Sequence, residues 1–174
     1  LILADSVAKG HFKFIDNSVV SEKAEILTEV ANNIFLIDGK PLKIVDKAEI
    51  EGLILADVAH AEAYVMDERT LRLLVEDYRN LLQLLERKFE KKIEVDKGNL
   101  KRFREFIGDV KIIRSVELMV IAYESGFFNQ YNSGKKYVYD YNKKILEGLL
   151  WGLRLRGCGI STQEINDILR IERV

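Results

Sequence analysis

Two aspartates follow apolar runs that the sequence predicts to be buried strands of a parallel sheet. Asp5 comes directly after residues 1–4, and Asp67 comes directly after residues 63–66. In open parallel sheets, ligands bind outside the carboxyl ends of the strands, where side chains of neighbouring strands meet. If these two strands are neighbours, the carboxylates of Asp5 and Asp67 lie close together. Their positions therefore indicate an acidic site at one edge of the sheet.

Two further acids are expected at the same edge. Glu49 begins an apolar stretch with helical spacing, and Glu68 stands beside Asp67. Carboxylates that share a site stay ionised at neutral pH only when a cation compensates them. Mg²⁺ or Mn²⁺ binds such oxygen ligands, leaves positions open for a phosphodiester and can activate a water molecule. These residue types predict a divalent-metal site for phosphodiester hydrolysis.

Each of these residues also has a purely structural interpretation. Glu49, Asp67 and Glu68 stand near helix starts, where the helix dipole favours an acid without any metal. Asp57 falls on the predicted apolar face of its helix, so it is either a reserve metal ligand or a buried carboxylate bonded to a backbone group, a serine or an arginine. Cys158, between two glycines, is expected to be a small filler near a helix end.

Basic residues complete the candidates. Arg114 and Ser115 follow a predicted strand at residues 110–113, and the arginine is expected either to hold a phosphate or to neutralise the acids. Between residues 87 and 104, eight basic residues are interleaved with three acidic ones. This alternation favours an ion-paired, solvated helix face over an RNA-binding stripe.

Strands and helices that alternate along the chain predict an α/β fold with a mostly parallel sheet. One predicted helix reaches from Asn17 or Ser18 to residue 32, and two extended pieces follow it around a turn at residues 38–41. The apolar face expected for that helix consists of Val20, Ala24, Leu27 and Ala31. Further helices are expected at residues 47–62, 71–89 with a break near 76–77, 98–107, 116–124 and 137–155, and after a capping box at residues 161–164.

Composition bounds the class of protein. The chain has 174 residues, with 27 basic and 28 acidic side chains and a net charge of −1. This length suits one domain, and the balanced charge excludes a global field that would attract nucleic acid or an anionic membrane. No apolar window approaches a membrane span and no secretory leader opens the chain, so we expect a soluble, cytoplasmic protein. The single cysteine excludes an internal disulfide, and the many Glu, Lys and Arg suit a heat-adapted protein.

The order of the acids and the stretch EIEGLILADVAHAEAYVMDER, residues 49–69, resemble the PIN-domain ribonucleases. IIRSVELMVIAYESGFF and LRLRGCGIS are similar to the C-terminal third of one uncharacterised branch of that family. The resemblance implies a three-layer α/β/α sandwich over residues 1–174 and RNA cleavage that depends on Mg²⁺ or Mn²⁺. It also implies a set of catalytic and metal-binding acids, with Glu68 assisting or replacing the last of them: Asp5, Glu22, Glu49 and Asp67.

The resemblance further implies partners. Many PIN proteins are the toxin of a toxin–antitoxin pair and many form homodimers, so RNA, an antitoxin protein and a second copy of the chain are expected partners. The chain also departs from the family. Only 17 positions separate Asp5 from Glu22, fewer than in family members. Either the first crossover is reduced or residues are missing from it, and the length that a strand-helix-strand crossover needs favours missing residues. Residues 76–109 are a predicted helical insertion, followed by C-terminal helices at residues 137–174.

These departures keep a second function open, a PIN-fold module for RNA binding or protein assembly that does not cut RNA. Glu22 is the acid with the strongest structural alternative, because an acid near the first turn of a helix is common. Ser18 or Ser21 is then the residue that caps this helix.

Overall fold

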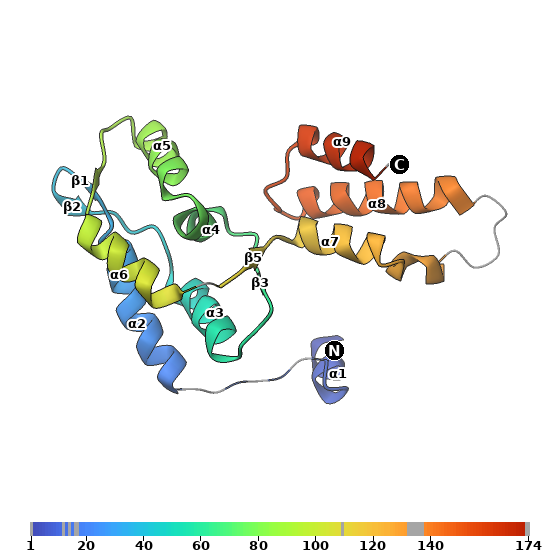
Figure 1. The fold of residues 1–174 in the computed structure, drawn as a ribbon, viewed down its shortest axis with the longest axis horizontal. Coiled ribbons are helices and arrows are strands. Elements are labelled where there is room, and N and C mark those ends of the chain that lie inside the picture. The colour runs from blue at the N-terminus through green and yellow to red at the C-terminus, as the bar shows by residue number, and fades with distance from the viewer. Residues whose placement is uncertain are drawn as a thin grey trace.

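The computed structural model describes residues 2–11, 13, 15, 18–108, 110–131 and 138–172. Figure 1 shows two groups of elements that meet at the short strands β3 (Tyr64–Val65) and β5 (Ile112–Ile113). The N-terminal lobe, residues 18–113, and the C-terminal lobe, residues 114–172, each have a hydrophobic cluster of their own. The protein is therefore an α/β structure that is mostly helical and joined at one small parallel pair.

The N-terminal lobe is built on α2 (Ser18–Asn32), α3 (Lys47–Val58) and α6 (Lys97–Ile107), which pack against one another. The apolar face predicted for α2 is confirmed, since all four members are buried: Val20, Ala24, Leu27 and Ala31. The predicted break in the next helical stretch is also confirmed, because α4 (Arg69–Glu76) ends where α5 (Tyr78–Phe89) begins. Asn17, the other predicted start of α2, lies outside the described residues.

Three short strands of this lobe form an antiparallel sheet in the order β2-β1-β4. β1 (Phe35–Ile37) turns back into β2 (Lys40–Pro41) through Asp38 and Gly39, and β4 (Glu94–Val95) pairs with the other side of β1. Asp38 and Gly39 have φ angles of 51° and 74°. Two positive φ values are what a two-residue hairpin turn with native strand twist requires, so the predicted turn is confirmed.

The parallel pair β3–β5 lies where the two lobes meet. Tyr64 is opposite Ile112 and Val65 is opposite Ile113, and the Met66 amide donates to the Ile113 carbonyl at 2.8 Å. Both strands therefore end at the same edge of the pair, as the sequence predicted for Asp67 and Arg114. α3 packs closely on β3, because a Cβ added at Gly52 would overlap the Tyr64 hydroxyl.

The C-terminal lobe consists of α7 (Ser115–Glu124), the 3-10 helix η1 (Phe127–Tyr131), α8 (Val138–Leu155) and α9 (Thr162–Ile171). α8 packs on both α7 and α9. The predicted capping box at the start of α9 is confirmed, because the Ser161 amide donates to Glu164 at 2.8 Å and the Glu164 amide donates to the Ser161 hydroxyl at 3.1 Å. Residue 137, where α8 was predicted to begin, lies outside the described residues.

The strand predicted at residues 1–4 is wrong, because α1 occupies Ile2–Ala8. A short apolar run does not separate strand from helix by periodicity. Asp5 of α1 forms an ion pair of 2.7 Å with Lys9, the residue that follows the helix. Residues four positions apart face each other on a helix but not on a strand. Asp5 is therefore a residue of a short helix and does not follow a strand.

α3 ends at Val58, four residues before the predicted end. Ala59 and His60 form a turn in which His60 has a left-handed φ of 49°, so the helix stops there. The placement of Asp57 on a buried face is wrong, because its side chain is exposed. Ile50, Leu53 and Ile54 of the same predicted face are buried, and Val58 packs against the core from a partly buried position.

The sheet is smaller and less parallel than predicted. In the described part of the chain, parallel pairing is limited to β3 and β5, and the three-stranded sheet is antiparallel. The β1–β2 hairpin explains part of this difference, since a two-residue turn connects only antiparallel strands. None of the helices that the structure describes is long and apolar enough to cross a membrane.

Candidate functional site at the β3–β5 edge

Asp67 and Ser115 meet at the carboxyl edge of the parallel pair. Asp67 follows β3, and Ser115 follows β5 as the first residue of α7. The Ser115 amide donates to Oδ1 of Asp67 at 2.9 Å, and the Ser115 hydroxyl donates to Oδ2 at 2.6 Å. The thiol of Cys158, which follows α8, donates to Oδ1 at 3.4 Å. One carboxylate of the N-terminal lobe thus accepts three hydrogen bonds from the C-terminal lobe.

These contacts keep Asp67 ionised. Partial burial opposes the charged form, but the hydrogen bonds from Ser115 and Cys158 and the positive charge of Arg114 outweigh it and lower the pKa of Asp67. The same contact acts in the opposite direction on the thiol. Burial first, and then the hydrogen bond to Asp67, raise the pKa of Cys158 to about 11. The edge therefore carries a carboxylate beside a protonated thiol at neutral pH.

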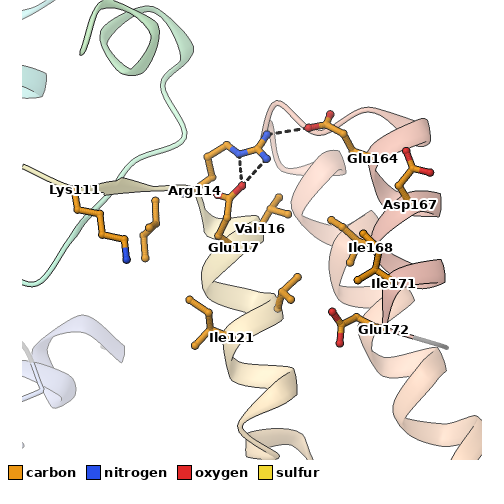
Figure 2. A pocket seen from close by; sticks show the side chains of 12 residues that line it. Lys111, Arg114, Val116, Glu117, Ile121, Glu164, Asp167, Ile168, Ile171 and Glu172 are labelled. Atoms are coloured by element: carbon orange, nitrogen blue, oxygen red, sulfur yellow. Dashed lines mark hydrogen bonds and ion pairs between the residues drawn. The ribbon is translucent and has the colours of Figure 1, made fainter. Parts of the chain in front are cut away.

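Arg114, the last residue before α7, is held by two glutamates, as Figure 2 shows. Its guanidinium donates to Glu117 at 2.5 and 2.8 Å and to Glu164 of α9 at 3.1 Å. Its amide also donates to Glu117 at 2.6 Å. The hydrogen bond to Glu117 is the largest cause that raises the pKa of Arg114. The arginine is thus paired with two acids outside the predicted set, and it acts on the predicted Asp67 only through its charge.

The other acids predicted near this edge act as helix caps. Both oxygens of Glu68 accept amides at the start of α4, from Thr70 at 2.8 Å and from Leu71 at 2.6 Å. Glu49 accepts the Asp46 amide at 2.9 Å in the capping box of α3. Glu49 also lies near β3, since its charge contributes, after burial, to the raised pKa of Tyr64. These two placements match the structural interpretation of Glu49 and Glu68.

The remaining predicted acids lie elsewhere. Asp5 is exposed on α1, which stands apart from β3 and β5 in Figure 1. Glu22 is exposed on α2, and Asp57 is exposed in the last turn of α3, where it borders a small cleft with Lys23 and Phe106. Of the predicted site residues, the structure brings together Asp67, Ser115 and, through its charge, Arg114.

This placement supplies fewer acids than the metal cluster that the sequence predicted. Among the residues that the structure describes, no three His, Cys, Asp or Glu side chains come close enough to hold a metal ion together. Asp67 is the predicted ligand at the edge, and its two oxygens already accept hydrogen bonds from protein groups. We therefore derive no reaction step through a metal ion.

Sequence reasoning missed three residues of this edge: Cys158, Glu117 and Glu164. The sequence did contain a signal for Glu117. It stands three residues after Arg114, the residue that precedes α7, and this is the position of the glutamate in a capping box. Glu164 was recognised in that role for α9, but its second bond, to Arg114, joins positions 50 residues apart. No local pattern indicates such a contact, and the same holds for Cys158 and Asp67.

A groove lies between α7 and α9, on the side shown in Figure 2. It has a volume of about 550 Å³ and is lined by six aliphatic and six charged residues. Five of the aliphatic side chains belong to the two helices: Val116, Val120, Ile121, Ile168 and Ile171. The Arg114–Glu164 bridge joins the beginnings of the two helices. At their ends, burial and then the charge of Glu124 raise the pKa of Glu172, which lines the groove. One end of the groove is therefore neutralised and the other is acidic.

Compared with known proteins, the chain matches no family model, no curated protein and no solved structure.

Proposed function

We propose that the protein is a metal-dependent ribonuclease of PIN type whose reaction centre is the carboxyl edge of β3–β5. The observation that carries this function is Asp67, an ionised carboxylate at the end of β3, beside Ser115 at the end of the parallel strand β5. Ligand sites of parallel sheets form at such edges. The resemblance of residues 49–69 to the PIN-domain ribonucleases supports the same function, and with it a PIN-like α/β/α arrangement of the chain.

The metal requirement rests on the resemblance to the PIN-domain ribonucleases, since the described residues bring one of the predicted acids to the edge. Mg²⁺ or Mn²⁺ would supply charge stabilisation and an activated water molecule for hydrolysis. The residues of the chain itself contribute an oriented and ionised carboxylate. Ser115 orients the Asp67 carboxylate through two bonds, and the Arg114 charge lowers its pKa, so the carboxylate stays an acceptor at neutral pH.

An RNA cleavage assay tests this function. We expect the full chain to cut some member of a panel of single-stranded and hairpin RNAs with Mg²⁺ or Mn²⁺ and to lose this activity in EDTA. Asp67→Asn keeps the side-chain size and removes the charge, so cleavage should fall at least about 100-fold, the order of effect of removing one key charge in a site. Glu25→Gln, which removes an exposed acid of α2 that lies 4.0 Å from Lys47, is the matched control and should cleave normally.

Cleavage that persists in EDTA would contradict metal dependence. Equal cleavage by wild type and Asp67→Asn would remove the β3–β5 edge as the reaction centre. Melting curves of both variants separate a loss of chemistry from a loss of folding, and the change at the exposed Glu25 is not expected to affect the fold.

A second candidate function is a protein-assembly module that does not cut RNA. Two observations favour it: Glu49 and Glu68 serve as caps, and the α7–α9 groove is open and apolar. The acidic end of the groove, at Glu172 and Glu124, complements a cation. The fitting occupant is an amphipathic helix of a partner protein, such as an antitoxin, with an aliphatic stripe and a lysine or arginine at one end.

A synthetic helical peptide of that pattern tests the module. Ile121 and Leu118 are similarly exposed on α7, at 49% and 46%, but only Ile121 lines the groove. We expect Ile121→Asp to weaken peptide binding at least about tenfold, which is about 1.4 kcal/mol, and Leu118→Asp to leave it unchanged. Equal effects of the two variants would exclude the groove. A concentration-dependent dimer that Ile121→Asp dissociates would identify a second copy of the chain as the occupant instead.

A further inference from the structure

The α5–α6 region carries a local excess of positive charge. Residues 78–108 contain nine basic and five acidic residues, a net charge of +4 in a chain whose net charge is −1. Three of the five acids are engaged: Glu86 accepts the Ile93 amide, Asp96 caps α6, and Glu105 pairs with Lys101. The acids of this region therefore compensate few of its cations.

The cations themselves are mostly unpaired. Lys91 pairs with Asp38, and Lys101 pairs with Glu105. Within the part of the chain that the structure describes, the other seven form no ion pair and all are exposed: Arg79, Arg87, Lys88, Lys92, Lys97, Arg102 and Arg104. The ion-paired face that the sequence favoured between residues 87 and 104 is thus limited to two of its eight cations, Lys91 and Lys101.

Aromatic rings hold several of these cations in place. The guanidinium of Arg104 on α6 lies 4.9 Å from the ring centre of Tyr78 on α5, and that of Arg79 lies 5.9 Å from the same ring. At the other end of α5, the Lys88 ammonium lies 5.5 Å from the ring centre of Phe89, which is 38% exposed. Cations that stack on rings are oriented before a ligand arrives, so less entropy is lost on binding.

The two stacked groups are separated by the length of one helix. Tyr78 is the first residue of α5 and Phe89 is the last of its twelve residues, so they stand about 16 Å apart. Arg87 lies in the last turn of α5, at the same end of the helix as Lys88 and Phe89. Two groups of cations, each beside an aromatic ring, match a flexible polyanion with flat bases. Phosphates pair with guanidinium groups, and bases stack on rings or guanidinium planes.

We infer that the α5–α6 surface, centred on Tyr78 with Arg79 and Arg104, binds single-stranded RNA. The choice of RNA rests on the proposed ribonuclease function, whereas the polyanion surface rests on the charges and stacking contacts alone. Arg79 and Arg104 contact phosphates, and Phe89 with Lys88 contacts a second stretch of the same strand. This surface positions the substrate and takes no part in chemistry.

Fluorescence anisotropy in EDTA tests binding separately from cleavage. The full chain is titrated onto a labelled, unstructured RNA of about 20 nucleotides over a range of salt concentrations, with no divalent metal present. We expect saturable binding that weakens as salt rises. Arg79→Gln/Arg104→Gln should weaken binding at least about tenfold and reduce the slope of log K against log salt by about 1.4, because two phosphate contacts are lost.

The matched control removes the same charge elsewhere. Arg154, which lies 5.4 Å from the Trp151 ring centre on α8, and Arg170, which pairs with Asp167 on α9, are changed together to glutamine. This control should change RNA affinity less than about twofold, since the two arginines act on the α5–α6 surface only through long-range electrostatics. Arg79→Lys/Arg104→Lys should keep the salt slope and lose part of the affinity, because lysine keeps the charge but not the flat stacking group.

Three results would overturn the inference: equal weakening by the two glutamine pairs, stronger competition by polyglutamate or single-stranded DNA than by RNA, or no saturable binding at low salt. The outcomes also separate this surface from the proposed reaction. RNA that is bound but never cut supports the surface and contradicts the ribonuclease. RNA that is cut with equal efficiency by wild type and the Arg79→Gln/Arg104→Gln variant supports the ribonuclease and contradicts the surface.

Discussion

At the residue scale, the contact between Asp67 and Ser115 is the feature on which most of the account depends. Both positions could be predicted from the sequence, because each follows a strand of a parallel pair. The third partner, Cys158, could not, since it is 91 residues away in the chain and its position between two glycines suggested only a filler role.

We predict that Ser115→Ala lowers the free energy of unfolding by about 1.5–3 kcal/mol at pH 7, the usual contribution of a hydrogen bond to a charged group. The pKa of Asp67 is lowered in the folded protein, so its contribution is present above the unfolded pKa of about 3.9 and is lost as pH falls through the folded value. Urea unfolding of wild type and variant between pH 7 and pH 3 measures this difference.

The difference between wild type and Ser115→Ala should therefore shrink in acid. Ser125→Ala, which removes an exposed hydroxyl bonded to the Ile121 carbonyl, is the control and should change stability by no more than about 0.5 kcal/mol at either pH. A Ser115→Ala penalty that is as large at pH 3 as at pH 7 would mean that the hydroxyl does not act through the Asp67 charge.

Cys158 gives a second prediction at this scale. A pKa raised from 9.0 to about 11 lowers its thiolate fraction at pH 8 about 100-fold, and the thiolate is the reactive form. Iodoacetamide should thus label the folded protein at least about 100 times more slowly than the same protein unfolded in urea. Comparable labelling rates in the two states would contradict the buried contact with Asp67.

At the element scale, helices with caps or a clear apolar face were predictable. The face of α2, the break between α4 and α5 and the capping box of α9 all follow from local spacing. α1 was not predictable, because a four-residue apolar run suits a strand or a helix equally. The end of α3 was not predictable either, because the helical pattern of the sequence continues past His60, where the left-handed φ ends the helix. β4 was missed because two residues carry no period at all.

Gly52 tests how α3 is held against β3. Alanine is normally favoured over glycine inside a helix by about 0.5–1 kcal/mol, but at Gly52 its Cβ would overlap the Tyr64 hydroxyl. We predict that Gly52→Ala lowers stability by about 1–2 kcal/mol, since overpacking outweighs the helix propensity. Gly148→Ala on α8, where a Cβ would meet open space, should instead stabilise the protein by about 0.5–1 kcal/mol. Stabilisation by both substitutions in urea unfolding would show that α3 and β3 are not in close contact.

At the scale of the whole molecule, two lobes with separate hydrophobic clusters meet at β3–β5 and at the bonds around Asp67. The parallel edge, the cationic α5–α6 surface and the α7–α9 groove are three features of one chain with different expected ligands. The parallel edge could be predicted, because Asp67 and Arg114 each follow an apolar run typical of a buried strand. The groove could not, because it depends on how α7 and α9 are arranged on α8, which no local pattern encodes.

The most direct test of the reaction centre is the position of a bound metal. Crystals of the full chain grown with Mn²⁺ should give an anomalous peak about 2 Å from a carboxylate oxygen of Asp67, the distance of a direct oxygen ligand to a small divalent ion. The same peak should be absent in Asp67→Asn crystals. A manganese peak that lies elsewhere, or that persists in Asp67→Asn, would contradict a metal-dependent reaction centre at the β3–β5 edge.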